Sequence, residues 1–293
     1  MTQTRFHLID GGLSTELTRL GADLSGELWT GRVLLEDASL VEQAHRNFAE
    51  AGATVVISSS YQLSRQGFEE IGLTASDART ALLNSVAVAR RAVAGTQAKV
   101  AASVGPFGAV LHDGSEYRGD YEVDQAFLEH FHAERLAVLL EAEPDYLAVE
   151  TIPNVVEARA LAKVLSEVKI PTWVSFTAAT EADLWSGEPI AEAAAAVAQL
   201  ENLIAIGVNC VAPDLVTGLL RNIGTVTDSP KIAYPNGGRV WDSALGEWSG
   251  QAPRPVIEYL PEWLDAGAAW IGGCCETSST DIHTLASVAL GDG

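Results

Sequence analysis

Little positive charge is present in this chain. Its 293 residues carry 18 Lys and Arg against 39 Asp and Glu, which gives a formal net charge of −21. Nucleic-acid binding relies on clustered Lys and Arg that displace counterions, so this composition argues against a nucleic-acid partner. Anionic membrane surfaces are disfavoured for the same reason. We interpret the acidity as promoting solubility as a monomer or small homo-oligomer, with a mild preference for cationic ligands.

Long apolar runs and cysteines are also scarce. No segment has the roughly 18 consecutive apolar residues of a membrane span, and residues 1–6 lack the apolar stretch of a signal peptide. The chain has three cysteines, so at least one cannot pair internally. Reduced thiols are typical of the cytoplasm, and we therefore predict a cytoplasmic protein without a membrane partner.

What the chain does have is a repeated alternation of short apolar runs and helical patterns. The runs occupy residues 6–9, 54–58, 99–104, 146–149, 172–176, 203–208, 231–234 and 269–271. Helical spacing of apolar residues lies between and after them, over about 39–51, 82–93, 128–142, 154–167, 190–200, 214–226, 256–266 and 280–290. Runs that are apolar on both faces are typical of parallel strands covered by helices.

Eight such strand–helix units predict an α/β fold, namely a (βα)8 TIM barrel that forms one domain over residues 1–293. The alternative is an open doubly wound sheet, which needs a phosphate-binding turn such as Gly-x-Gly-x-x-Gly after the first strand. That pattern is missing after the first run, where the sequence reads Asp10-Gly11-Gly12. The barrel is therefore the favoured fold.

Polar residues collect at the ends of the predicted strands. In a TIM barrel the catalytic groups come from the C-terminal ends of the strands, where side chains from different strands meet. The residues found at those ends are Asp10, residues 58–61, Glu150, Asn209, Cys210, Asn236, Cys274 and Cys275. The sequence therefore predicts that these side chains surround one barrel mouth.

All three cysteines follow predicted strands directly. Cys210 follows the sixth strand, and Cys274 and Cys275 follow the eighth behind Gly272-Gly273. Three thiolates suit Zn²⁺ and leave a fourth position for a substrate. Burial as small hydrophobic side chains is the alternative. A redox pair is less favoured, because adjacent cysteines form strained disulfides and no Cys-x-x-Cys is present.

A zinc ion with three thiolate ligands is suited to particular chemistry. It activates water poorly, for which His and carboxylate ligands are typical. It holds a substrate thiol well, because coordination deprotonates the thiol at neutral pH. The cysteines therefore predict alkyl transfer to sulfur.

The motifs around these residues are similar to those of a known family. They are Asp10-Gly11-Gly12, Glu27-Leu28-Trp29, Ser60-Tyr61-Gln62, Asp113-Gly114-Ser115-Glu116-Tyr117-Arg118-Gly119-Asp120-Tyr121, Glu150-Thr151-Ile152-Pro153-Asn154, Gly207-Val208-Asn209-Cys210, Tyr234-Pro235-Asn236 and Gly272-Gly273-Cys274-Cys275. Together they resemble the homocysteine S-methyltransferases over almost the whole chain. The Asp113–Tyr121 loop resembles the cobalamin-independent group that uses S-methylmethionine.

The resemblance implies a role for each matching residue. Cys210, Cys274 and Cys275 would bind zinc, with the homocysteine sulfur in the fourth position. Asp10 and Glu150 would receive the homocysteine ammonium, and main-chain amides near Gly11 and Ser58 would hold its carboxylate. Asn209 would support the metal-site turn or the substrate. Betaine-using relatives carry a tyrosine where this chain has Thr151, so we expect water as the resting fourth ligand.

The methyl donor would be a sulfonium cation, which aromatic rings can stabilise by cation–π contact. The candidates for donor binding are Trp29, Tyr61, Tyr117, Tyr121 and Asn236. Plain packing is the alternative for each aromatic residue, and Asn236 could instead shape its loop. Glu116 and Arg118 are either donor contacts or a solvated pair.

The function predicted from the sequence is zinc-dependent methyl transfer from a sulfonium donor to homocysteine, which forms methionine. S-adenosylmethionine could serve as the donor, and selenocysteine could replace homocysteine. A barrel that only stores or senses zinc is the non-catalytic alternative. Asp10 and Glu150 argue against storage, because a storage site needs no receptor for an ammonium group. For Asp10 a turn cap, and for Glu150 a structural ion pair, are the simpler interpretations.

Overall fold

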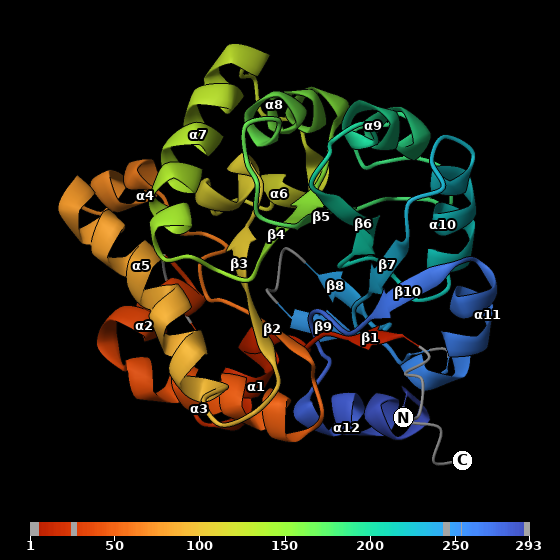
Figure 1. Ribbon diagram of the computed structural model, residues 1–293, viewed down its shortest axis with the longest axis horizontal. Coiled ribbons are helices and arrows are strands. Elements are labelled where there is room, and N and C mark those ends of the chain that lie inside the picture. Colours follow the sequence, from red (N-terminus) through yellow and green to blue (C-terminus); the bar gives the residue numbers. More distant parts are fainter. Residues whose placement is uncertain (1–5, 25–27, 243–246, 253, 290–293) are drawn as a thin grey trace.

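Eight parallel strands form a barrel that is surrounded by helices in the computed structural model (Figure 1). The structure describes residues 6–24, 28–242, 247–252 and 254–289. The barrel strands are β1 (His7–Leu8), β2 (Val55–Ile57), β3 (Lys99–Val104), β4 (Tyr146–Ile152), β5 (Thr172–Phe176), β6 (Leu203–Asn209), β7 (Lys231–Tyr234) and β10 (Ala268–Ile271). The predicted strands are confirmed, with ends that differ by a few residues.

The order of the strands shows how the barrel closes. The sheet runs β1-β10-β7-β6-β5-β4-β3-β2, with all neighbours parallel. A parallel bridge between Ile9 and Val55 then joins the first and second strands. The predicted (βα)8 TIM barrel is therefore confirmed, and the C-terminal ends of all eight strands point to one mouth.

The barrel interior is filled by side chains of alternating size. Small residues on three strands, Ala101, Ala148 and Ala205, leave room for Trp173 and Trp270, whose ring centroids lie 6.0 Å apart. Trp173 is fully buried and Trp270 is 7% exposed. Large rings set against alanines are a means of filling a barrel core without voids.

Helices cover the outer face of the barrel. They are α1 (Leu13–Arg19), α2 (Thr30–Glu36), α3 (Ala38–Glu50), α4 (Arg65–Glu70), α5 (Ala75–Ala92), α6 (Ser115–Arg118), α7 (Gln125–Glu141), α8 (Val155–Leu165), α9 (Ile190–Val197), α10 (Val216–Gly224), α11 (Leu260–Asp265) and α12 (Ser279–Ala289), with 3-10 turns η1 (Phe107–Val110) and η2 (Val256–Tyr259). Helix α5, the longest of them, shows why these helices form. In α5 a capping box pairs Thr74 with Asp77, and Leu82, Val86 and Ala89 are buried along one face.

Short elements were the ones that the sequence did not predict. Helices α1 and α2 fill the stretch between the first strand and α3, and α6 lies in what we expected to be a polar loop. A hairpin of β8 (Val240–Asp242) and β9 (Glu247–Ser249) follows β7. Helices α1 and α2 have seven residues each and α6 has four, which is shorter than the window of roughly 11 residues over which helical periodicity can be recognised.

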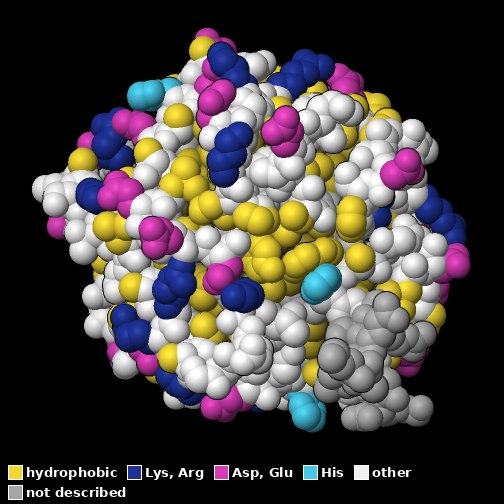
Figure 2. Space-filling view, viewed as in Figure 1, with side chains coloured by type: hydrophobic (Ala, Val, Ile, Leu, Met, Phe, Trp, Pro, Cys, Tyr) yellow, Lys and Arg dark blue, Asp and Glu magenta, His cyan; other side chains and the backbone are white. Residues whose placement is uncertain are grey.

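Charged and apolar side chains are distributed differently over the surface. On the face shown in Figure 2, acidic and basic side chains are interspersed around the rim, and hydrophobic ones gather near the centre.

Among the described residues, none of the helices has the length and apolar character needed to cross a bilayer. Glu27, Leu290 and residues 1–5, which entered the motifs and elements expected from the sequence, lie outside the described residues.

Candidate active site

The turn after β10 carries two of the cysteines, and its shape depends on glycine. A Cβ atom on Gly272 would lie 2.2 Å from a side-chain carbon of Ile9, and one on Gly273 would lie 2.1 Å from Thr277. No other residue fits these two positions without moving its neighbours. The turn is also tied to β7, because the Cys274 amide donates to the Pro235 carbonyl at 2.7 Å.

Cys210 reaches the same point from the end of β6. Its backbone is left-handed, with φ of 51°, and its amide donates to the Tyr234 carbonyl at 3.2 Å. Its Sγ atom lies 2.9 Å from Sγ of Cys274 and 3.6 Å from Sγ of Cys275. All three sulfurs lie within 4.8 Å of one another. The sequence-based prediction that the three thiols converge is confirmed.

This arrangement of the three thiols could hold a metal ion. In a tetrahedral zinc site with Zn–S bonds of about 2.3 Å, the sulfurs are about 3.8 Å apart, which is within the observed spread.

The pKa shifts of the three thiols also favour a bound cation. Hydrogen bonds from the neighbouring thiols lower the pKa of Cys210, whereas the same cluster raises the pKa of Cys274 and Cys275. Without a cation the cluster therefore favours a single thiolate.

Two buried carboxyl groups lie on the neighbouring part of the mouth. Asp10, at the end of β1, is 2% exposed and accepts a hydrogen bond from the Ile57 amide at 2.8 Å. Glu150, on β4, is 7% exposed. Burial raises the pKa of Asp10 well above its usual value, and the charge of Glu150 raises it further. Burial likewise raises the pKa of Glu150 to about 7. Neither carboxylate has a basic partner among the ion pairs between described residues, so both are receptive to a cation.

Glu150 is oriented by hydroxyl groups. One carboxylate oxygen accepts a hydrogen bond from Ser103, and the other accepts one from Tyr234 at 3.2 Å. The Tyr234 hydroxyl in turn accepts from the Trp173 indole at 3.1 Å and lies 2.6 Å from the hydroxyl of Ser175. The sequence pointed to Tyr234 only as part of a motif, and its role in orienting Glu150 appears only in three dimensions.

Asn209 links the ends of β4, β5 and β6. Its side-chain oxygen accepts from the Thr151 amide and from the Ser175 hydroxyl, both at 2.7 Å, and its amide donates to the Thr151 hydroxyl at 2.7 Å. Thr151 has a left-handed backbone, with φ of 63°, and these contacts fix it. Asn209, the residue before Cys210, is thereby tied to β4 and β5, and its expected role toward the metal-site turn or the substrate stays a prediction.

A cavity of about 660 Å³, including its open mouth, joins the cysteines to the carboxylates. Most residues selected from the sequence lie on its wall: Asp10, Gly11, Trp29, Ser58, Tyr61, Tyr117, Glu150, Asn209, Cys210, Cys274 and Cys275. The Tyr117 hydroxyl is 3.8 Å from Sγ of Cys210. The cavity therefore brings thiols, carboxylates and aromatic rings into one space.

Two of the expected donor contacts lie elsewhere. The Tyr121 hydroxyl donates to the buried carboxylate of Glu157, and the Tyr121 ring packs edge-on against Phe107 at 5.4 Å between centroids. Asn236 shapes its own loop, because its side-chain oxygen accepts from the Gly238 amide at 2.9 Å. Neither residue lines the cavity.

In the loop that carries Tyr117, the two charged neighbours of this residue, Glu116 and Arg118, lie in different environments. Arg118 is exposed and pairs with Asp120 at 3.0 Å and with Asp113 at 3.7 Å. Glu116 is half-buried on α6, and burial raises its pKa to about 7. Arg118 therefore forms solvated ion pairs, as one of the two interpretations expected. Its partners are Asp113 and Asp120, however, and not Glu116.

The serines after β2 lie partly on the cavity wall. The Ser58 amide donates to the Ala101 carbonyl at 2.8 Å, so it belongs to the sheet and is occupied. The hydroxyl of Ser58 lies 2.9 Å from that of Ser60. Ser59 also lines the cavity, and its buried hydroxyl has no hydrogen-bond partner among the described residues. Ser59 therefore offers a further donor beside the main-chain amides near Gly11 and Ser58, whose role in holding the substrate carboxylate stays a prediction.

The comparison with known proteins agrees with this site. Residues 7–289 match the sequence profile described as homocysteine S-methyltransferase. The chain belongs to the homocysteine S-methyltransferase family. It is 38% identical to homocysteine S-methyltransferase 2 of Arabidopsis thaliana, over 96% of this chain and 92% of that protein. It is 39% identical to a selenocysteine Se-methyltransferase of Brassica oleracea var. italica, over 96% of this chain and 88% of that protein.

A solved structure extends the similarity to three dimensions. The metallated form of the homocysteine methyltransferase MmuM from Escherichia coli superposes with a TM-score of 0.86 at 37% identity. The alignment covers 97% of this chain and 96% of that structure. Membership of the family is thus shown along the whole barrel, and the resemblance noted in the sequence is confirmed.

Proposed function

We propose that this protein transfers a methyl group from a sulfonium donor to the thiol of L-homocysteine and forms methionine, with zinc held by Cys210, Cys274 and Cys275. S-methylmethionine is the proposed donor, and S-adenosylmethionine is the second one to be tested. The observation that carries the proposal is that three converging thiols share one cavity with two buried carboxyl groups, which have no basic partner in the part of the chain that the structure describes.

Zinc fits the donor set, because three thiolates form a soft site with one position left for a substrate sulfur. When bound, the ion would supply an environment in which a substrate thiol is deprotonated at neutral pH. Among the described residues that line the cavity, none is histidine, lysine or arginine.

Asp10 and Glu150 would bind the ammonium group of the amino acid. Both carboxylates are costly to ionise in the empty cavity, and a bound cation would offset that cost. Ser59 and the backbone near Gly11 would hold the substrate carboxylate, because the Ser59 hydroxyl is buried and unpaired among the described residues. These contacts would place the substrate thiol toward the cysteines.

The transfer itself needs alignment of three atoms. The bond between the methyl carbon and the donor sulfur breaks, and its electron pair stays on that sulfur, which becomes a neutral thioether. The lone pair of the homocysteine thiolate forms the new bond to carbon. Trp29, Tyr61 and Tyr117 line the cavity and would stabilise the cationic donor with their ring faces. Holding the reacting atoms in line would supply much of the acceleration.

The test is a measurement of zinc per chain together with methionine formation from each of the two sulfonium donors. We expect about one zinc ion per chain in the wild type, and loss of both zinc and turnover in the Cys210→Ala variant. Circular dichroism would verify that the barrel remains folded. Tyr121→Phe serves as a control outside the cavity and should retain zinc. Full turnover by zinc-free wild-type protein would contradict the mechanism.

Selenocysteine is a second acceptor to consider. The relative from Brassica oleracea is named for methylation of selenocysteine and is as similar to this chain as the homocysteine enzymes. A side-by-side measurement of kcat/KM for the two acceptors with one donor would separate these functions. A storage role is less well supported, because storage gives no reason for Asp10 and Glu150 to be buried without basic partners.

A further inference from the structure

Helix α1 contacts the turn that carries Cys274 and Cys275. The amide of Glu276, the residue after the cysteine pair, donates to Oγ1 of Thr15 at 2.8 Å. The amide of Gly12, just before α1, donates to the Thr277 carbonyl at 2.8 Å. Glu276 has a φ of 66°, a conformation that is unfavourable for a residue with a side chain. External contacts are therefore needed to keep this turn in its shape.

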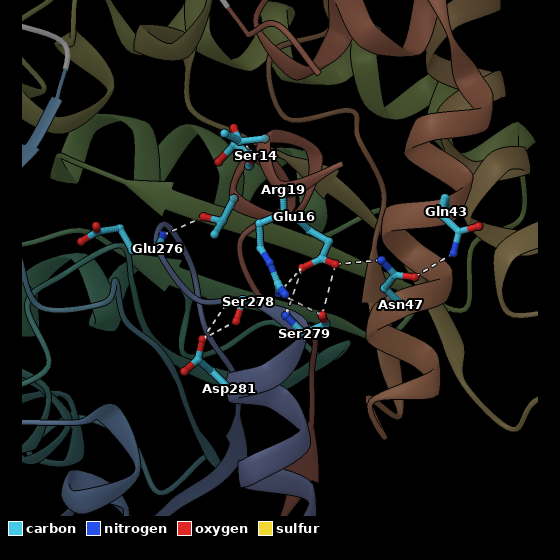
Figure 3. A network of polar contacts seen from close by, with 11 residues as sticks. Ser14, Glu16, Arg19, Gln43, Asn47, Glu276, Ser278, Ser279 and Asp281 are labelled. Carbon is cyan, nitrogen blue, oxygen red and sulfur yellow. Dashed lines mark hydrogen bonds and ion pairs between the residues drawn. The ribbon is translucent and has the colours of Figure 1, made fainter. Parts of the chain in front are cut away.

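Glu16, the next residue on α1, fixes the far end of the same turn. It is only 3% exposed. Its carboxylate accepts hydrogen bonds from the amide of Ser279 at 3.2 Å, from the Ser279 hydroxyl at 3.1 Å and from Nδ2 of Asn47 at 2.8 Å. It also pairs with Arg19 at 3.3 Å. Figure 3 shows Glu16 between Asn47 on α3 and Ser279 at the start of α12.

The contacts of Thr15 and Glu16 therefore bracket the segment from the cysteine pair to α12. Within the bracket, the Thr277 amide donates to the Cys274 carbonyl at 3.1 Å and closes the turn. On its other side, the Gly273 amide donates to the carbonyl of Asp10 at 3.0 Å. The segment from Asp10 to Glu16 thus touches both ends of the cysteine turn and also carries the carboxylate that faces the cavity.

We propose that Thr15 and Glu16 are positioning residues that hold the dicysteine turn in a metal-ready shape before the ion binds. This inference rests on the proposed function, because it assigns to these residues the pre-organisation of the zinc ligands. Neither residue lines the cavity that holds the three cysteines. Groups that orient metal ligands typically change metal affinity by 10- to 100-fold when they are removed.

A purely structural role is the competing explanation for Glu16. Its carboxylate lies at the N-terminus of α12, where a negative charge stabilises a helix. Asp281 provides the matched comparison, because its carboxylate accepts from the amide and hydroxyl of Ser278 at the same helix end. Among the hydrogen bonds and ion pairs of the described residues, none joins the Asp281 side chain to the turn between Cys274 and Thr277, so its loss should affect the helix and leave the cysteines in place.

The experiment compares four variants of the full chain by zinc affinity, by hydrogen exchange and by the Tm of thermal unfolding. Thr15→Val removes the acceptor while keeping the shape of the side chain, and Thr15→Ser keeps the acceptor. Glu16→Gln removes the charge at the turn, and Asp281→Asn removes the charge that only caps the helix. Zinc affinity is measured by competition with a chromophoric chelator. Hydrogen exchange of the peptide that spans residues 272–279 is measured in the metal-free protein.

We expect Thr15→Val and Glu16→Gln to weaken zinc binding by about 10- to 100-fold and to speed exchange of that peptide. Thr15→Ser should stay within about 3-fold of wild type, and Asp281→Asn should lower Tm without a comparable loss of zinc affinity. Equal zinc affinity and equal exchange in Thr15→Val and wild type would overturn the proposal, as would equal effects of Glu16→Gln and Asp281→Asn on affinity.

The exchange measurement keeps this proposal separate from the proposed function. If the wild type binds no zinc, the zinc-dependent mechanism fails, but faster exchange in Thr15→Val than in Thr15→Ser would still establish that Thr15 holds the turn. If the wild type binds zinc and no variant changes exchange or affinity, the positioning role fails and the mechanism stands.

Discussion

Replacing Glu150 with glutamine tests the electrostatic state of the cavity. Burial raises the pKa of the Glu150 carboxyl from 4.5 to about 7, and the nearby Cys210 thiolate acts in the same direction. Hydrogen bonds from Ser103 and Tyr234 oppose this rise without cancelling it. At roughly 1.4 kcal/mol per pH unit, the ionised carboxylate costs the metal-free and substrate-free fold roughly 3 kcal/mol at pH 8.

The sign of the pH dependence follows from proton linkage. The folded protein binds this proton more tightly than the unfolded chain does. The cost is therefore absent below pH 4.5, grows between pH 4.5 and about 7, and is complete above that range. Glutamine has a similar shape and no charge. The Glu150→Gln variant should be more stable than wild type at pH 8 by up to roughly 3 kcal/mol, and within about 1 kcal/mol of it at pH 5.

Thermal unfolding of the metal-free proteins, followed by circular dichroism at pH 5, 6.5 and 8, provides the assay. For a protein of this size, 3 kcal/mol corresponds to an increase in Tm on the order of 6 °C. Glu157→Gln is the matched control, because its fully buried carboxylate accepts from His132 at 2.8 Å and from the Phe107 amide at 2.7 Å. That variant should lose stability at pH 5 and pH 8 alike.

The reasoning is refuted if Glu150→Gln lowers Tm at pH 8 as much as at pH 5. Such a result would mean that hydrogen bonds within the fold already stabilise the ionised Glu150 carboxylate. It would then have no cost to be offset by an ammonium group, and the proposed receptor would lose its electrostatic basis. The proposed zinc site would be unaffected by this outcome.

Two further predictions concern the cavity wall. Tyr117→Leu should raise KM for a sulfonium donor by about 5- to 30-fold, which corresponds to the roughly 1–2 kcal/mol of a cation–π contact, while Tyr117→Phe should stay within about 3-fold. Steady-state kinetics at saturating homocysteine would measure both KM values. Equal KM values for the Leu and Phe variants would contradict the contact. Asn209→Ala leaves the Thr151 amide and hydroxyl and the Ser175 hydroxyl without their partner, and it should cost about 3 kcal/mol in urea unfolding. A loss below about 1 kcal/mol would show that the Asn209 contacts are replaced by water.

Much of the barrel can be predicted from the sequence because its strands are covered on both sides. All residues of β5, and all residues of β3 after Lys99, are buried, so each strand reads as a mostly apolar run. Their C-terminal ends must meet at one mouth, and this is enough to bring Cys210 and the cysteine pair together. The short elements behave differently, since α6 has four residues and gives no periodic signal.

The details of the cavity wall depend on geometry that the sequence does not display. Tyr117 and Tyr121 lie in the same loop, yet the turn of α6 brings the first to Cys210, and a hydrogen bond to Glu157 holds the second away. Ser58 and Ser59 are neighbours in a run of three serines. Successive residues of an extended chain point to opposite sides, and only the structure shows which hydroxyl is left free.

The arrangement of the strands also sets when the cysteine trio can assemble. Cys274 and Cys275 follow β10, which pairs with β1, so His7 lies opposite Trp270 across a very long stretch of sequence. Contacts between such distant segments form late, because the intervening chain must be ordered first. During synthesis Cys210 therefore waits as a lone thiol until the last barrel strand has docked. Capture of the proposed zinc ion would therefore belong to the final stage of maturation, because a chain truncated before β10 carries only one of the three cysteines.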